Sequence, residues 1–143
     1  MTIDLNILTL CDYAKEYNGK VVISGALNTL LFKQFPATCQ ELALIARFSV
    51  DEPGEYNIEF GVIGKNNEKP IIVPQKLKMT KTKGLMNSYF NLIIKGTNVV
   101  IPSMGDYKVY FKIEDQEFST NLNIVDANTT SELKKDLKIS QSK

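Results

Sequence analysis

The sequence contains no histidine and no tryptophan among its 143 residues. Histidine is the commonest general acid–base group and the commonest metal ligand, so its absence removes the usual centre of catalysis or metal binding. Tryptophan is strongly enriched at binding hot spots, so only tyrosine and phenylalanine can supply aromatic contacts. These two absences narrow the chemistry that is open to the chain.

Cysteine is scarce as well, since Cys11 and Cys39 are the only two, and their spacing matches no zinc or redox motif. The first residues lack a basic region followed by a continuous apolar run, so neither a secretory signal nor a transmembrane helix is expected. We therefore expect a cytoplasmic protein with two reduced thiols. An exported protein, the alternative, would allow a Cys11–Cys39 disulfide.

No nucleophile has the neighbours that would activate it. Cys11 would need a nearby base, and the sequence has no histidine to act as one. Neither a Gly-x-Ser-x-Gly elbow nor a glycine-rich phosphate loop occurs. We therefore expect no enzymatic activity and no cofactor.

Charge is balanced, with 17 basic and 16 acidic residues and a formal net charge of +1. This balance favours neither a polyanionic partner nor a self-repelling chain. Four lysines cluster around Met79 without neighbouring aromatic residues, so we expect them to protect a sheet edge rather than to bind nucleic acid: Lys76, Lys78, Lys81 and Lys83.

The dominant positive signal is an alternation of apolar and polar residues. It runs through three segments, residues 56–62, 107–113 and 117–124. Successive side chains of a strand point to opposite faces, so each segment predicts a strand with one buried and one wet face. Further strand candidates, more apolar on both faces, cover residues 3–10, 20–32, 42–50, 70–79, 85–95 and 99–101.

Glycine, asparagine and proline separate these segments where turns are needed. Within 20–32, Gly25 predicts a bulge or bend. About eight short strands with frequent turns predict an all-β protein, and specifically an immunoglobulin-like antiparallel β-sandwich over residues 1–126. Tyr107, which follows a turn, resembles the tyrosine that pins a corner of such domains. The tail, 127–143, is expected to form a short helix over residues 131–138 or to be disordered.

Residues 12–17 provide the best candidate binding site. They are expected to form a loop or helical turn between two strands, with Asp12, Tyr13 and Tyr17 as the contact residues. Tyrosine offers a large contact area with a polar tip, which suits a recognition surface. The competing interpretation is that the tyrosines simply close one end of the sandwich.

Two other polar features favour a structural interpretation. Glu114, Asp115 and Glu117 gather at the last hairpin turn, but calcium needs six to eight oxygens, so a solvated turn is expected and no metal site. Arg47, the only arginine, lies within an apolar strand, where it is expected on the wet face in a snorkelling or surface-paired role.

Two stretches, residues 10–14 and residues 19–26, resemble the opening of a family of small bacterial proteins of unknown function. The strand at 42–47 and the unit that begins at Gly105 occupy the positions that this family would give them. The resemblance extends to about Val125 and leaves the tail outside. It implies a small bacterial β-sandwich and carries no activity.

These features predict a module that binds a protein partner or associates with itself, without nucleic-acid or membrane binding. Two alternatives stay open. One is a structural component of a phage-derived or other multi-subunit assembly, and the other is a small-ligand or carbohydrate-binding domain, which would require a concave, aromatic-lined pocket.

Overall fold

A computed structural model describes residues 1–84 and 89–128 of the chain. These residues form nine strands with the following bounds: β1 (Ile3–Tyr17), β2 (Lys20–Leu27), β3 (Thr29–Phe32), β4 (Ala37–Val50), β5 (Gly54–Gly64), β6 (Ile72–Lys81), β7 (Phe90–Ile101), β8 (Gly105–Ile113) and β9 (Gln116–Asp126). The predicted all-β class is confirmed, with nine strands in place of about eight. The predicted helix at 131–138 lies outside the described residues.

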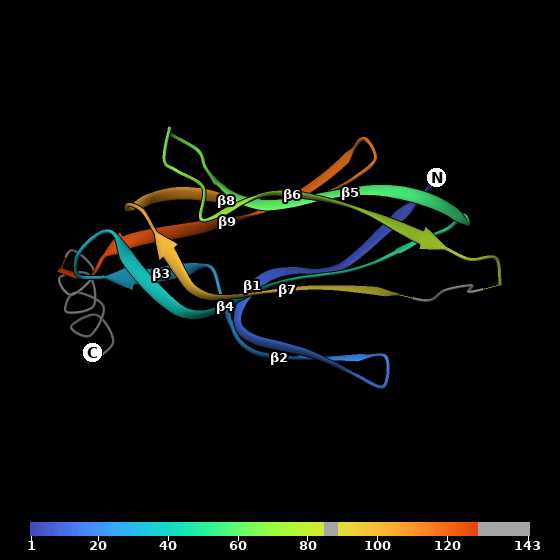
Figure 1. Ribbon diagram of the computed structural model, residues 1–143, viewed down its shortest axis with the longest axis horizontal. Helices are drawn as coiled ribbons and strands as arrows, with labels where there is room; N and C mark the ends of the chain where they lie inside the picture. Colours follow the sequence, from blue (N-terminus) through green and yellow to red (C-terminus); the bar gives the residue numbers. More distant parts are fainter. Residues whose placement is uncertain (85–88, 129–143) are drawn as a thin grey trace, which may run out of the picture.

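The strands form two facing sheets (Figure 1). One has four strands in the order β2-β1-β4-β7, and the other has five in the order β3-β9-β8-β5-β6. One pair departs from the predicted antiparallel arrangement, because β3 runs parallel to β9. The chain leaves the first sheet at Asn28, between β2 and β3, and enters the second sheet beside its last strand. The expectation that 20–32 is not one straight strand is confirmed, but the break falls at Asn28, and Gly25, with φ +68°, lies inside β2.

The main core lies between the two sheets. The predicted face of β4 is confirmed, because all five of its members are at most 2% exposed and face the other sheet: Leu42, Leu44, Ala46, Phe48 and Val50. Across the interface, the ring centroid of Phe48 lies 4.6 Å from that of Phe111 on β8. Alternation with period two thus supplies one apolar face from each sheet.

The four-stranded sheet has a second apolar face because it curls into a half-barrel. In Figure 1, β1 bends away from the sandwich near its middle, and the β1–β2 hairpin projects below the sheet. A third cluster fills the inside of this curl: Cys11, Ala14, Ala43 and Ile45, with Ile7, Val21, Ile23 and Ile93 packed against them. β4 is therefore covered on both faces, which explains why its sequence is apolar on both.

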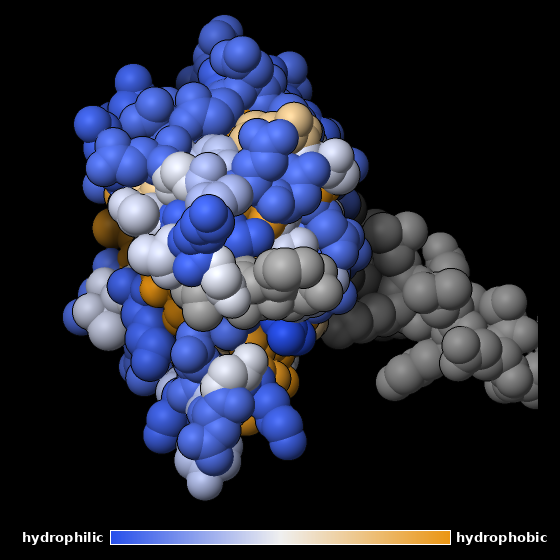
Figure 2. Space-filling model, turned by 90° about the vertical axis from the view of Figure 1, so that its right-hand side faces the viewer, coloured by the Kyte–Doolittle hydropathy of each residue, from blue (hydrophilic) through white to orange (hydrophobic). Residues whose placement is uncertain are grey.

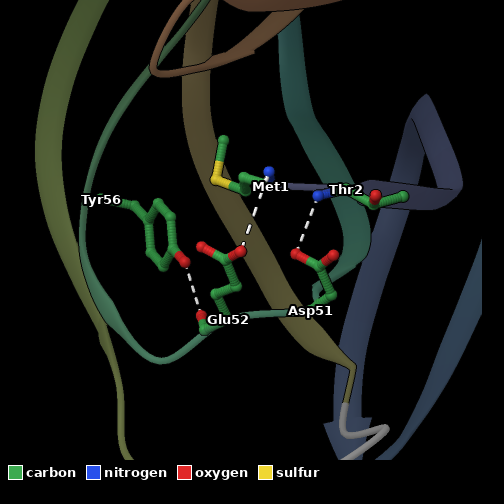
Figure 3. A network of polar contacts seen from close by, with 5 residues as sticks. All are labelled: Met1, Thr2, Asp51, Glu52 and Tyr56. Atoms are coloured by element: carbon green, nitrogen blue, oxygen red, sulfur yellow. Dashed lines mark hydrogen bonds and ion pairs between the residues drawn. The ribbon is translucent and has the colours of Figure 1, made fainter.

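One end of the sandwich is closed by polar contacts between the start of β1 and the β4–β5 turn (Figure 3). The amide of Thr2 donates to Asp51 Oδ1 at 2.8 Å, and the Met1 ammonium lies 4.0 Å from Glu52 Oε1. The hydroxyl of Tyr56 donates to the Glu52 carbonyl. The hydrogen bond from Thr2 lowers the pKa of the Asp51 carboxyl. The polar groups at this end therefore have a structural role, because they join the first residues of the chain to the β4–β5 turn.

Candidate functional site

The three predicted contact residues lie in a strand, and the prediction of a loop or helical turn at 12–17 is wrong. β1 continues to Tyr17 because it pairs with β2 as far as Tyr17↔Lys20. The turn between them is Asn18-Gly19, and both residues have positive φ, 50° and 76°. This is the dipeptide that a two-residue hairpin turn favours, so the local sequence is sufficient to extend the hairpin.

Tyr13 and Tyr17 share one face of this hairpin with Val22. The register places Tyr13 opposite Ser24, Lys15 opposite Val22, and Tyr17 opposite Lys20. We call this set of six residues the hairpin face. Its three large hydrophobic side chains are 43%, 63% and 52% exposed for Tyr13, Tyr17 and Val22. The ammonium of Lys95 lies 5.3 Å from the centroid of the Tyr13 ring.

Asp12 has a different position from the two tyrosines. Its side chain covers Gly25, where an added Cβ would meet Asp12 Oδ2 at 2.2 Å. Gly25 has φ +68°, a conformation that only glycine adopts readily. Asp12 and Tyr13 line one side of a cleft of about 190 Å³, and Tyr17 does not. The structure therefore groups Asp12 with Tyr13, while Tyr17 stands at the hairpin tip.

The projecting hairpin encloses apolar surface. Figure 2 views the right-hand end of Figure 1, and hydrophobic colour is visible between the lower projection and the body. Val21 and Ile23 of the hairpin pack against the cluster that contains Ile45. Two contacts tie the hairpin back to β7: Asn91 Nδ2 donates to Glu16 Oε2 at 3.1 Å, and Lys95 lies over Tyr13. These contacts with β7 support the strand pair that presents the hairpin face to solvent.

The strand candidates at 85–95 and 99–101 fall together in one strand, β7, over residues 90–101, but sequence reasoning missed that this strand is a sheet edge. It lies at the end of its sheet order, with β4 as its only neighbour in the described residues. Clefts in the described part of the chain border it, and one of about 600 Å³ lies between β7 and β6. The available signal was a long apolar run with a single lysine and no proline, next to a lysine-rich segment.

β6 is the edge of the other sheet and carries Lys76, Lys78 and Lys81, so the expectation that these lysines lie on a sheet edge is confirmed, while Lys83 follows the strand. Lys76 lies 3.9 Å from Glu59 on the outer face of the five-stranded sheet. Lys81 differs from the others, because it is buried and donates to the Val50 carbonyl. An edge position therefore accounts for the lysines of β6, and an ion pair accounts for Lys76 in addition.

Arg47 is on the outer face of its sheet, as expected, but it has an aromatic neighbour in place of an acidic one. Its guanidinium carbon lies 4.8 Å from the centroid of the Tyr89 ring. The Tyr89 hydroxyl donates to Asp4 Oδ2 at 2.6 Å, which holds the ring in place. Arg47 Nε and Asn91 Oδ1, on register partners, are buried without a hydrogen bond.

Other candidate chemistry is weak in the described part of the chain. No group of three or more histidine, cysteine, aspartate or glutamate residues there could hold a metal ion. Glu114 instead accepts a hydrogen bond from the Asn57 amide at 2.7 Å. Burial raises the pKa of both thiols, Cys11 and Cys39, which lowers their nucleophilicity at neutral pH. No helix in residues 1–84 and 89–128 is long and apolar enough to span a membrane.

The outer face of the five-stranded sheet carries a tyrosine with a strongly shifted pKa. The Tyr110 hydroxyl donates to Glu59 Oε2 at 3.0 Å. Burial, followed by this hydrogen bond and the charge of Glu59, raises the pKa of Tyr110 to about 12. The neutral phenol is favoured in the folded state, so its contribution to stability is complete below about pH 10 and is lost as pH rises through about 12.

We expect an alkaline titration of tyrosinate absorbance to contain one component near 12 that Tyr110→Phe removes. Glu59→Gln should lower the pKa of this component, because the substitution removes the negative charge beside the phenol. A Tyr110→Phe protein that retains the late component would assign it to another tyrosine. An unchanged component in Glu59→Gln would contradict the role of the carboxylate.

Comparison with known proteins places the chain in a family. No curated protein matches the sequence. Residues 6–125 match the model of a family of unknown function, DUF6941. This match confirms the family resemblance seen in the sequence and ends at Val125, where the resemblance ends too. Because it covers well over half of the chain, the protein belongs to the DUF6941 family.

Proposed function

We propose that this protein is a non-enzymatic module that binds another protein through the hairpin face. The observation that carries the proposal is the exposure of Tyr13, Tyr17 and Val22 together on one face of a projecting hairpin. Exposed tyrosines give large contact area at a low cost in conformational entropy. Grouped exposed apolar side chains, unlike scattered ones, mark interaction sites.

The charges of the hairpin face support a partner with acidic residues. Lys15 and Lys20 lie on this face, and Asp12 is turned onto Gly25. The partner should therefore offer an apolar patch for the tyrosines with carboxylates at its rim. Rim charges mainly accelerate association, while the buried aromatic contacts provide most of the affinity.

We also infer that the sandwich is immunoglobulin-like. The orders β1-β4-β7 and β9-β8-β5 match strands A-B-E and G-F-C of such domains, and β6 extends the second sheet as C′. The Tyr107 hydroxyl donates to the Ser103 carbonyl at 2.8 Å, in the manner of a corner tyrosine. In this assignment, β2 and the parallel strand β3 are additions. Domains of this kind commonly present binding surfaces on a rigid scaffold.

The test is affinity capture from the source cells with quantitative mass spectrometry. We expect one protein to be retained by the wild type and reduced roughly 30-fold by Tyr17→Ser, the loss typical of an aromatic hot spot. Val22→Glu should also reduce it, whereas Met104→Glu, a substitution at similar exposure on another surface, should not. Equal retention by all variants, or no retained protein, would contradict the proposal.

Self-association is distinguished by sedimentation of the purified protein over a range of concentrations. If the wild type forms an oligomer that Val22→Glu dissociates, then the partner of the hairpin face is a second copy of the chain. A monomer at all concentrations leaves the heterologous partner as the expected result.

A further inference from the structure

The edge of β7 is the least protected sheet edge of the described residues. Natural edges are blunted by short length, lysine, proline or bends. β3 has four residues, β2 has eight, and β6 contains Pro74 and several lysines. β7 has twelve residues, contains no proline, and turns its one lysine, Lys95, onto the Tyr13 ring. Its backbone groups on the side away from β4 have no strand partner among residues 1–84 and 89–128.

An apolar cleft of about 600 Å³ runs beside this edge, between β7 and β6. Its wall is formed mainly by hydrophobic side chains: Phe60, Ile71, Ile72, Ile94, Val99 and Val100. Val100 on one side is 55% exposed, and Val73 at the start of β6 is 60% exposed. The edge strand therefore has an apolar cleft directly beside it that can accept side chains.

The charge of the cleft has one sign. Lys69 and Lys95 are its charged lining residues, and none of the lining residues is acidic. Neither lysine belongs to an ion pair within residues 1–84 and 89–128. An occupant with carboxylates would complement this charge, whereas a second copy of β7 would bring Lys95 and its counterpart together.

We propose that β7 accepts an extended acidic and apolar segment of a partner protein as an added strand. The backbone of the segment would form ladder hydrogen bonds with the free side of β7. Apolar side chains at every second residue of the segment would enter the cleft beside Ile94, since alternate side chains of a strand point to one face. Its carboxylates would lie near Lys69 and Lys95. This site meets the hairpin face only through Lys95, which lies over the Tyr13 ring, and the proposal does not rest on the hairpin face as a binding site.

The probe is a blocked ten-residue peptide in which glutamate and valine alternate, added to the ¹⁵N-labelled full chain. We expect saturable amide shifts concentrated in β7 and the cleft, and slower hydrogen exchange along β7. The same residues in block order, five glutamates followed by five valines, should bind at least about tenfold more weakly, because only alternation matches the strand period. A peptide in which lysine and valine alternate should show a similar loss of binding, because its positive charges repel the two cleft lysines.

Two substitutions of one type make the matched control. Val100→Glu places a negative charge on the cleft and should weaken the alternating peptide about tenfold or more. Val22→Glu, on the hairpin face at similar exposure, should leave peptide binding unchanged. Both positions are exposed, so both variants should fold, and their thermal unfolding checks this.

Several results would overturn the proposal. They are the absence of saturable shifts, shifts centred outside β7, equal binding of the block or lysine peptide, and equal weakening by the two valine substitutions. If the wild type forms a dimer in the absence of peptide and Val100→Glu dissociates it, then the β7 edge binds a second copy of the chain instead. Because the hairpin face is tested by Val22→Glu and this edge by Val100→Glu, either proposal can fail alone.

Discussion

Phe48→Ala is expected to lower the free energy of unfolding by about 3–5 kcal/mol. Phe48 is 1% exposed and lies where the two sheets meet. Its ring centroid is 4.6 Å from that of Phe111 on the facing sheet and 5.7 Å from that of Phe90 on β7. The substitution removes the buried ring, leaves a cavity between strands that cannot close freely, and breaks both aromatic contacts.

Chemical denaturation followed by circular dichroism measures this change. Val100→Ala is the control, because an exposed side chain away from the core should change stability by no more than about 0.5 kcal/mol. A loss below about 1 kcal/mol for Phe48→Ala would mean that the facing sheets do not pack as described.

Tyr107→Phe is the second large effect, with an expected loss of about 1–3 kcal/mol. Tyr107 is fully buried at the start of β8, and its hydroxyl donates to the Ser103 carbonyl at 2.8 Å. Removing one oxygen leaves the ring packing intact but leaves that carbonyl without its donor. The cost is therefore that of an unpaired polar group and involves little change in volume.

Tyr17→Phe is the matched control, since it deletes the same atom from a side chain that is 63% exposed. Its free energy of unfolding should match that of the wild type within about 0.5 kcal/mol. Equal losses in the two variants would show that the hydroxyl of Tyr107 does not pin the turn before β8.

The parts of the fold that follow from local patterns could be predicted. The alternation in β4 identifies its buried face, and the turn residues Asn18-Gly19 lie where the structure closes its first hairpin. The parallel pairing of β3 with β9 could not be predicted, because its partners, such as Leu30 and Ile124, lie far apart in sequence. No local residue pattern records which sheet a strand joins.

The candidate site was predicted in part for the same reason. Tyr13 and Tyr17 were singled out by residue type, and their exposure on one face depends on a register with β2 that only the folded hairpin defines. The sequence singled out Asp12 as well, but it did not indicate that its side chain covers Gly25 or that it lines a cleft with Tyr13. The open edge of β7 is a property of the sheet order, so it is invisible until the neighbours of each strand are known.

The double coverage of β4 decides where this scaffold can be re-engineered. From Leu42 to Ala46, successive side chains enter the sandwich core and the half-barrel in turn, and all five are buried. A designer grafting a new recognition sequence therefore has no position in this stretch to vary freely. The Asn18-Gly19 turn joins β1 to β2 and lies outside both cores, so it is the natural insertion point.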